Sequence, residues 1–175
     1  MKTQPSSIKA KALRLLAQRD YSYAELNAKL QKWLQTKNQQ MQEDDAATVE
    51  SLSSEQMQEI ADILNEFQQR GWVSDQRVVE AVIYQKAPRL GQARLRQELK
   101  AKGLDESVVQ EALSELKESE FERACAVWQR KFSNFPSDAN SYQKQARFLT
   151  YRGFSSEVTR KVLAGGWNNI MESGT

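Results

Sequence analysis

The residues best suited to a chemical role in this chain are basic side chains gathered over residues 89–100. They are Arg89, Arg94, Arg96 and Lys100. At 100° per residue, the first, third and fourth fall within about 40° of each other on a helix, roughly a quarter turn from Leu95 and Leu99. Grouped cations of this kind hold carboxylates or phosphates. They also occur on ordinary solvated faces, where each local pair contributes about 0.2–0.5 kcal/mol.

A second basic set lies on the predicted helix over about residues 138–152. Its members are Lys144, Arg147 and Arg152. These side chains are open to the same two interpretations, a contact with an anionic partner or a solvated face. We take both sets as candidate contact residues.

Other kinds of site chemistry find little support in the composition. The chain has no histidine and one cysteine, which excludes Ser-His-Asp and Cys-His catalysis and leaves no soft-metal cluster. No Gly-x-x-x-x-Gly-Lys-Ser/Thr loop is present. Carboxylate pairs such as Asp44–Asp45 lie in polar segments and are typical of solvated charge. We therefore expect no catalytic residue, metal or cofactor, and we expect Cys125 to be a small buried apolar side chain.

Charge alternates strongly along the chain, although the formal net charge is only +2. Residues 1–40, 41–75, 76–104, 105–122 and 123–175 carry net charges of +6, −8, +5, −6 and +5. One interpretation is solubility with salt bridges between neighbouring helices. The other is that folding aligns the basic blocks toward a polyanion or an acidic protein surface.

An internal repeat indicates the scaffold that positions these charges. The segment Gly103–Val108 is followed by the apolar pair Ala112–Leu113, and fifty residues later Gly153–Val158 is followed by Val162–Leu163 at the same offsets. Units of this size bury their apolar faces by stacking on neighbours. The pattern predicts an all-α, solenoid-like fold, a class that usually binds partners.

We predict nine helices in three tandem three-helix repeats. The repeats cover residues 1–72, 73–118 and 119–164, and residues 165–175 form a C-terminal tail that we interpret as disordered. The first repeat contains a polar stretch over about residues 36–51 without helical period, which we interpret as an exposed, mobile insertion. Helix starts are predicted from the capping patterns Ser22 with Glu25, Ser53 with Gln56, and Asp105.

Four stretches, taken in order, resemble the RecX family and cover most of residues 8–164. The stretch Pro88–Leu104 is similar to the family's signature. Ala12–Leu26 resembles its opening helix and S-x-x-E-L turn. Arg70–Arg77 resembles its link of glycine, two hydrophobic residues and D-x-R, and Arg147–Ser155 resembles its closing R-F-L-x-x-R-G-F.

This resemblance implies a negative regulator of the RecA recombinase. Family members fold as three-helix repeats in an elongated, curved molecule that lies in the groove of the RecA–DNA filament and touches neighbouring protomers. They inhibit filament extension, strand exchange, ATP hydrolysis and the SOS co-protease activity of the filament. The implied partners are RecA and its nucleoprotein filament, the implied processes are DNA repair and recombination, and we expect a cytoplasmic monomer that is not an enzyme.

Two positions depart from the family pattern. Ser51 stands where Gly103 and Gly153 stand in the other repeats, and the predicted insertion precedes it. In the third repeat Gln145 replaces the leucine found at position 95 of the second. The alternative function is direct DNA binding, in which the same basic helices hold phosphates; a steep dependence on salt distinguishes the two.

Overall fold

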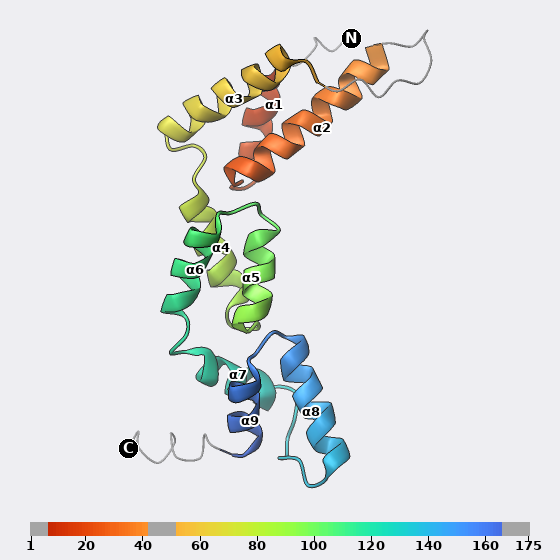
Figure 1. Ribbon diagram of the computed structural model, residues 1–175, viewed down its shortest axis with the longest axis vertical. Helices are drawn as coiled ribbons and strands as arrows, with labels where there is room; N and C mark the ends of the chain where they lie inside the picture. Colours follow the sequence, from red (N-terminus) through yellow and green to blue (C-terminus); the bar gives the residue numbers. More distant parts are fainter. Residues whose placement is uncertain (1–6, 42–51, 166–175) are drawn as a thin grey trace. The chain divides into compact units, whose positions relative to one another are not determined.

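The computed structural model describes residues 7–41 and 52–165, and every regular element in these ranges is an α-helix (Figure 1). The all-α class predicted from the sequence is therefore confirmed. The helices are α1 (Ile8–Leu16), α2 (Tyr23–Met41), α3 (Ser54–Gln69), α4 (Asp75–Lys86), α5 (Gln92–Lys100), α6 (Glu106–Glu115), α7 (Glu120–Gln129), α8 (Ala139–Tyr151) and α9 (Ser156–Leu163).

The chain divides into two compact units. The first contains the described residues up to Val78 together with the turn Lys102–Leu104, and the second contains Val79–Ala101 and the described residues from Asp105 onward. The predicted repeats correspond in sequence to α1–α3, α4–α6 and α7–α9. The units do not follow these repeat boundaries, because the turn after α5 belongs with the first unit.

The core of the first unit lies where α1, α2 and α3 pack on one another (Figure 1). Its apolar side chains recur at helical spacing, as the sequence predicted, so each helix turns one stripe inward. The stripe of α2 contains Leu26, Leu30 and Leu34, and that of α3 contains Ile60, Leu64 and Phe67. These six side chains are buried, and burial of each leucine-sized group contributes about 1.5–3 kcal/mol.

The prediction that residues 36–51 form an irregular insertion is wrong for its first six residues. Helix α2 continues to Met41, because the segment contains no glycine or proline and is rich in residues with good helix propensity. The Thr36 hydroxyl donates to the Lys32 carbonyl at 3.0 Å, and the Asn38 amide donates to Gln56 of α3 at 3.3 Å. Residues 42–51, including Ser51, and the tail from 166 lie outside the described residues.

The three predicted helix caps form to different extents. Ser53 and Gln56 form the reciprocal capping box that the sequence predicted. At α2 the Glu25 amide donates to the Ser22 hydroxyl oxygen at 3.1 Å, but the Glu25 carboxylate bonds elsewhere, so only half of that box forms. Asp105 occupies the predicted N-cap position of α6 without a side-chain capping bond.

The second unit contains the part of α4 from Val79, the pair α5–α6, and α7, which packs with α8 and α9. Leu95 and Leu99 are fully buried, as predicted. The α7–α9 cluster contains Trp128, Leu149 and Val162. Cys125 is buried here, in agreement with its predicted role, and burial raises the pKa of its thiol to about 11.

Gln145, which stands where the second repeat has Leu95, is buried and forms hydrogen bonds with both ends of its side-chain amide. Its side chain is buried, its carbonyl oxygen accepts from Trp128 Nε1 at 2.7 Å, and its amide nitrogen donates to the Asn134 carbonyl at 3.1 Å. An indole N–H needs such a partner when it is buried. The polar residue is therefore matched to the tryptophan of α7.

A recurring joint links the first residues of one helix to a glycine turn further along the chain. In the first unit, the Ser22 hydroxyl donates to the Lys102 carbonyl, and the Tyr23 amide donates to Asp75 Oδ1 at 2.9 Å. A Cβ placed on Gly103 would lie 2.5 Å from the Ala24 Cβ. We call this set of contacts the first joint.

The second unit contains the same joint at equivalent positions, which we call the second joint. The Gly91 amide donates to the Arg152 carbonyl at 2.9 Å, the Ala93 amide to the Gly153 carbonyl at 3.1 Å, and the Gln92 amide to Glu120 Oε1 at 2.9 Å. Ser22 thus corresponds to Gly91, Lys102 to Arg152, and Gly103 to Gly153. The four sequence stretches that resemble the RecX family contain most of the residues that form these two joints.

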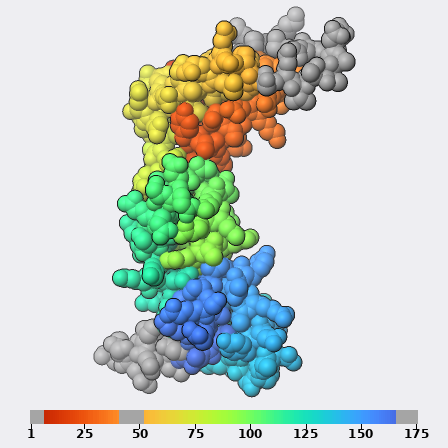
Figure 2. Space-filling model, in the orientation of Figure 1, coloured from red at the N-terminus to blue at the C-terminus, as the bar shows by residue number. Residues whose placement is uncertain are grey.

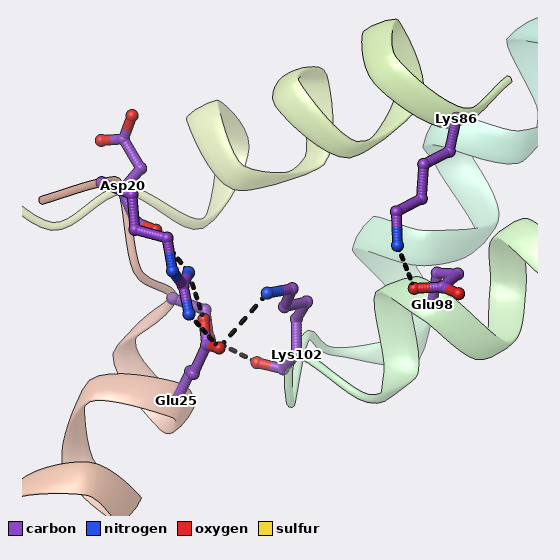
Figure 3. Close-up of polar contacts among 7 residues, drawn as sticks. Asp20, Glu25, Lys86, Glu98 and Lys102 are labelled. Carbon is purple, nitrogen blue, oxygen red and sulfur yellow. Dashed lines mark hydrogen bonds and ion pairs between the residues drawn. The ribbon is translucent and has the colours of Figure 1, made fainter.

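The charges at the two joints differ. In the first joint, Glu25 receives hydrogen bonds from Arg19 at 2.6 and 3.0 Å and from Lys102 Nζ at 3.2 Å (Figure 3). In the second joint, the position of Glu25 is taken by Arg94, opposite Arg152. An ion pair in one joint is thus replaced by two cations in the other.

Replacing Gln145 with leucine, the residue at the equivalent place in the second repeat, should destabilise the second unit. The variant leaves the Trp128 N–H buried without an acceptor, and we expect a loss of about 1–3 kcal/mol in the free energy of unfolding. Urea denaturation measures this loss. A variant as stable as the parent would contradict the account.

Alanine substitutions at the turn glycines should separate backbone strain from close contact. Gly71, Gly103 and Gly153 all have positive φ, but a Cβ on Gly71 meets nothing within 4 Å, whereas one on Gly153 lies 2.4 Å from the Arg94 nitrogen. We expect Gly71→Ala to cost about 1–2 kcal/mol, and Gly103→Ala or Gly153→Ala to cost a further 1–3 kcal/mol, roughly, from overpacking. Denaturation measures the free energy of unfolding of each variant. Equal losses in the three alanine variants would contradict the close packing of Gly103 and Gly153 at the joints.

Stability should depend on the ionisation of Glu25. Burial raises the pKa of its carboxyl, but the bonds from Arg19 and Lys102 outweigh burial and the pKa is lowered overall. The stabilisation is therefore complete above the unfolded pKa and is lost as pH falls through the lower folded pKa.

We expect Glu25→Gln to lower the free energy of unfolding by about 2 kcal/mol near neutral pH, and the difference from the parent to shrink at about pH 3. Glu111→Gln, on the exposed surface of α6, is the matched control and should change stability little at either pH. Denaturation at the two pH values measures both. A loss for Glu25→Gln that is the same at both would rule out the carboxylate as its cause.

Candidate binding surface

The seven candidate contact residues all lie in the second unit, on two helices and one turn. Arg94, Arg96 and Lys100 are on α5, and Lys144 and Arg147 are on α8. Arg152 is the C-cap of α8. Arg89 lies outside α5, in the turn before it, so its predicted place on one helical face with Arg96 and Lys100 is wrong. Pro88 and the tight turn around it end α4 and delay the start of α5.

Arg96 and Lys100 are neutralised within the chain. Both pair with Glu106 of α6: Arg96 Nη1 with Oε1, and Lys100 Nζ with Oε2 at 2.7 Å. Arg96 Nη2 also donates to Gln110 at 2.7 Å. The hydrogen bond from Lys100, with the nearby Arg96, lowers the pKa of Glu106. The α5–α6 hairpin brings the acid and the bases together.

The remaining five cations have no such partner. Within residues 7–41 and 52–165, none of Arg89, Arg94, Lys144, Arg147 and Arg152 forms an ion pair. Their polar contacts are neutral: Arg94 donates to the Gln97 amide oxygen at 3.0 Å, and Arg152 donates to the Arg89 carbonyl at 3.3 Å. The sequence contains no acidic residue between Asp138 and Glu157.

The second joint and one half-buried arginine position this group. The joint holds the start of α5 against the end of α8, which places Arg94 and Arg152 on neighbouring segments. Arg123 of α7 donates to the carbonyls of Ala87 and Leu90 at 2.9 and 2.7 Å, and so fixes the turn that carries Arg89. Burial lowers the pKa of Arg123 from its ordinary value, and five guanidinium donors suit it to holding carbonyls.

Two tyrosines belong to the same surface and were not predicted as site residues. Tyr151 is 79% exposed and Tyr142 is 41% exposed. The Arg94 guanidinium lies 5.8 Å from the centre of the Tyr151 ring. Both tyrosines border a shallow hollow of about 500 Å³ along α8, together with Gln143, Ala146, Arg147 and Thr150.

We define the basic–tyrosine surface as Arg89, Arg94, Tyr142, Lys144, Arg147, Tyr151 and Arg152. In the space-filling view, residues of α8, coloured light blue, lie at the surface of the second unit (Figure 2). By contrast, Lys86 of α4 and Glu98 of α5 point toward each other as an ion pair (Figure 3). Some described cations of this unit thus form internal ion pairs, whereas the cations of the basic–tyrosine surface do not.

Two other kinds of feature are absent from the described chain. No helix in the described ranges has the length and apolar content needed to cross a membrane. No group of three or more His, Cys, Asp or Glu side chains comes together there as a metal site. What the arrangement can do is bind an anion or a partner carrying anions.

These features define a class: an all-helical protein whose second unit presents unpaired cations at its surface. Comparison with known proteins gives the family. Models of the second and third three-helix domains of RecX match residues 74–113 and 118–163. A Regulatory protein RecX of Leptothrix cholodnii is 39% identical over 157 residues, covering 90% of this chain and 87% of that protein. One of Ralstonia nicotianae is 35% identical, with 93% and 89% covered. The chain belongs to the RecX family.

Solved structures agree in fold. The crystal structure of RecX from Lactobacillus salivarius matches with a TM-score of 0.66 at 16% identity, covering 90% of this chain and 93% of that one. A second, a crystal structure of regulatory protein RecX, matches with a TM-score of 0.64 at 22% identity, covering 89% and 72%. The family models and the sequence relatives confirm the resemblance based on the four sequence stretches.

Proposed function

We propose that this protein is a negative regulator of the RecA recombinase, which binds the RecA–DNA filament and inhibits its extension. Membership of the RecX family, with relatives similar over nearly the whole chain, is the observation that carries this proposal. Strand exchange, ATP hydrolysis and SOS co-protease activity depend on the filament, so all three are expected to fall. The protein acts by binding and needs no cofactor.

The charge distribution supports binding through the second unit. Like charges that are left unpaired near one another weaken a fold slightly, and the second joint has two cations where the first has an ion pair. A partner that carries carboxylates or phosphates at this surface would offset that repulsion. We therefore propose the five unpaired cations as contacts, and we assign Arg96 and Lys100 mainly to the α5–α6 hairpin.

The test is the ATPase activity of RecA on single-stranded DNA, titrated with this protein. The parent should inhibit. Arg94→Gln with Arg147→Gln should raise the concentration needed for half inhibition by about tenfold, which corresponds to about 1.4 kcal/mol. The matched control is Arg96→Gln with Lys100→Gln, which removes the same formal charge from residues already neutralised by Glu106, and it should inhibit nearly as well as the parent.

Two results would overturn parts of this proposal. A parent protein that leaves the ATPase unchanged in molar excess over RecA would contradict the regulatory function. Equal loss of inhibition in the two double variants would contradict the division between paired and unpaired cations. Repeating the titration at a salt concentration where binding to naked DNA has vanished tests for contact with the recombinase itself.

A further inference from the structure

Arg123 of α7 is a half-buried cation whose hydrogen-bond partners are neutral. Its Nη1 donates to the carbonyls of Ala87 and Leu90 in the turn before α5, at 2.9 and 2.7 Å. The same guanidinium donates to the Leu116 carbonyl and to the Ser119 hydroxyl oxygen, both at 3.2 Å. Among the described residues it forms no ion pair. Burial of a charge without an opposite charge costs free energy, which an apolar side chain at this place would avoid.

The first joint shows that this fold does not require a cation at such a position. Arg123 lies three residues after Glu120, the acid that accepts the first amide of α5. The corresponding acid of the first joint is Asp75, which accepts the first amide of α2. Three residues after Asp75 is Val78, which is only 4% exposed. Because a buried valine fits the equivalent place, packing alone does not explain Arg123.

The two joints also differ at the residue three positions before the helix start. In the first joint this residue is Asp20, whose carboxylate pairs with Arg77 Nε at 3.0 Å. In the second joint it is Arg89, whose side chain forms no ion pair within the described ranges. Its backbone is held instead, because Arg123 binds carbonyls before and after it and Arg152 donates to its own carbonyl at 3.3 Å. The second joint therefore fixes the backbone of Arg89 and leaves its side chain unpaired.

Such anchoring matters for Arg89 because it lies in a turn. Lys144 and Arg147 are on α8, where the backbone hydrogen bonds of the helix already restrict them. A turn has no such ladder of hydrogen bonds. Ordering a flexible segment on binding reduces affinity, and a segment that is rigid beforehand avoids this cost. Anchoring from outside the turn would therefore increase what Arg89 contributes to binding.

We propose that Arg123 is a positioning residue for the inhibition of RecA, which fixes the turn before α5 so that Arg89 contributes to binding. The inference rests on the proposed function. Arg123 itself does not contact the target. A lysine keeps the charge but lacks the rigid planar fork that reaches both groups of acceptors at once. The contribution of Arg89 therefore depends on Arg123, whereas that of Arg147 does not.

The test is a double-mutant cycle on the purified full chain, measured as inhibition of RecA ATPase on single-stranded DNA. Arg89→Gln and Arg123→Lys should each raise the half-inhibition concentration by about threefold, roughly half in free energy of a tenfold loss. Together they should still raise it by only about threefold, because they remove the same contribution. Arg147→Gln with Arg123→Lys should instead give about tenfold, the product of two independent effects. A general loss of stability would give equal combined effects with either partner.

Hydrogen exchange measured by mass spectrometry tests the anchoring without RecA. The amides of residues 89–91 are hydrogen-bonded at 2.9–3.0 Å. In Arg123→Lys they should exchange about tenfold faster, the effect of losing one hydrogen bond from a charged donor, while those of α8 stay unchanged. The matched control is Arg130→Lys at the exposed C-cap of α7, which should change neither exchange nor inhibition.

A milder variant guards against unfolding of the lysine variant, and circular dichroism checks that each variant stays helical. Ser119→Ala removes the acceptor of Arg123 Nε and should shift exchange and inhibition in the same direction by less. Unchanged exchange at residues 89–91, or independent effects of Arg89→Gln and Arg123→Lys, would overturn the inference. An inactive parent would instead contradict the proposed function, and the exchange measurement would then decide whether Arg123 fixes the turn.

Discussion

The contact on which the second unit depends is a glycine turn packed against the start of a helix. A Cβ on Gly91 would lie 2.3 Å from the backbone of Gly153, a separation that no side chain tolerates. Backbone amides at the start of α5 then reach the carbonyls of Arg152 and Gly153 directly. These amides would otherwise lack partners, as at any helix start. The joint therefore satisfies a general need of helices and fixes which segments meet.

The two joints also explain where the chain tolerates change. The turn after α5 packs against the start of α2, and the turn after α8 packs against the start of α5. Their glycines and their lengths are therefore constrained. In the sequence between α2 and α3, Ser51 stands where Gly103 and Gly153 stand in the other repeats.

The contacts between helices also decide which cations of the second unit are paired with acidic side chains. Glu106 is on α6, the helix that follows α5 directly, and it forms ion pairs with Arg96 and Lys100 of α5. The acid of the second joint, Glu120, is instead buried on the Gln92 amide, so it does not neutralise Arg94 or Arg152. Solvent and salt screen such surface charges strongly, which makes their number and placement more useful for recognition than for stability. The joint thus positions a surplus of positive charge that the unit does not need for folding.

The sequence by itself determined the all-α class, most of the helices and the family, because these follow from local periodicity, capping chemistry and motifs. It also identified all five unpaired cations among its seven candidates. Three matters depended on the tertiary structure: that Glu106 neutralises Arg96 and Lys100, that Gln145 serves Trp128, and that Tyr142 and Tyr151 face solvent. Each depends on which segments distant in sequence come within a few ångströms. Side-chain type and spacing along one helix carry no information about that.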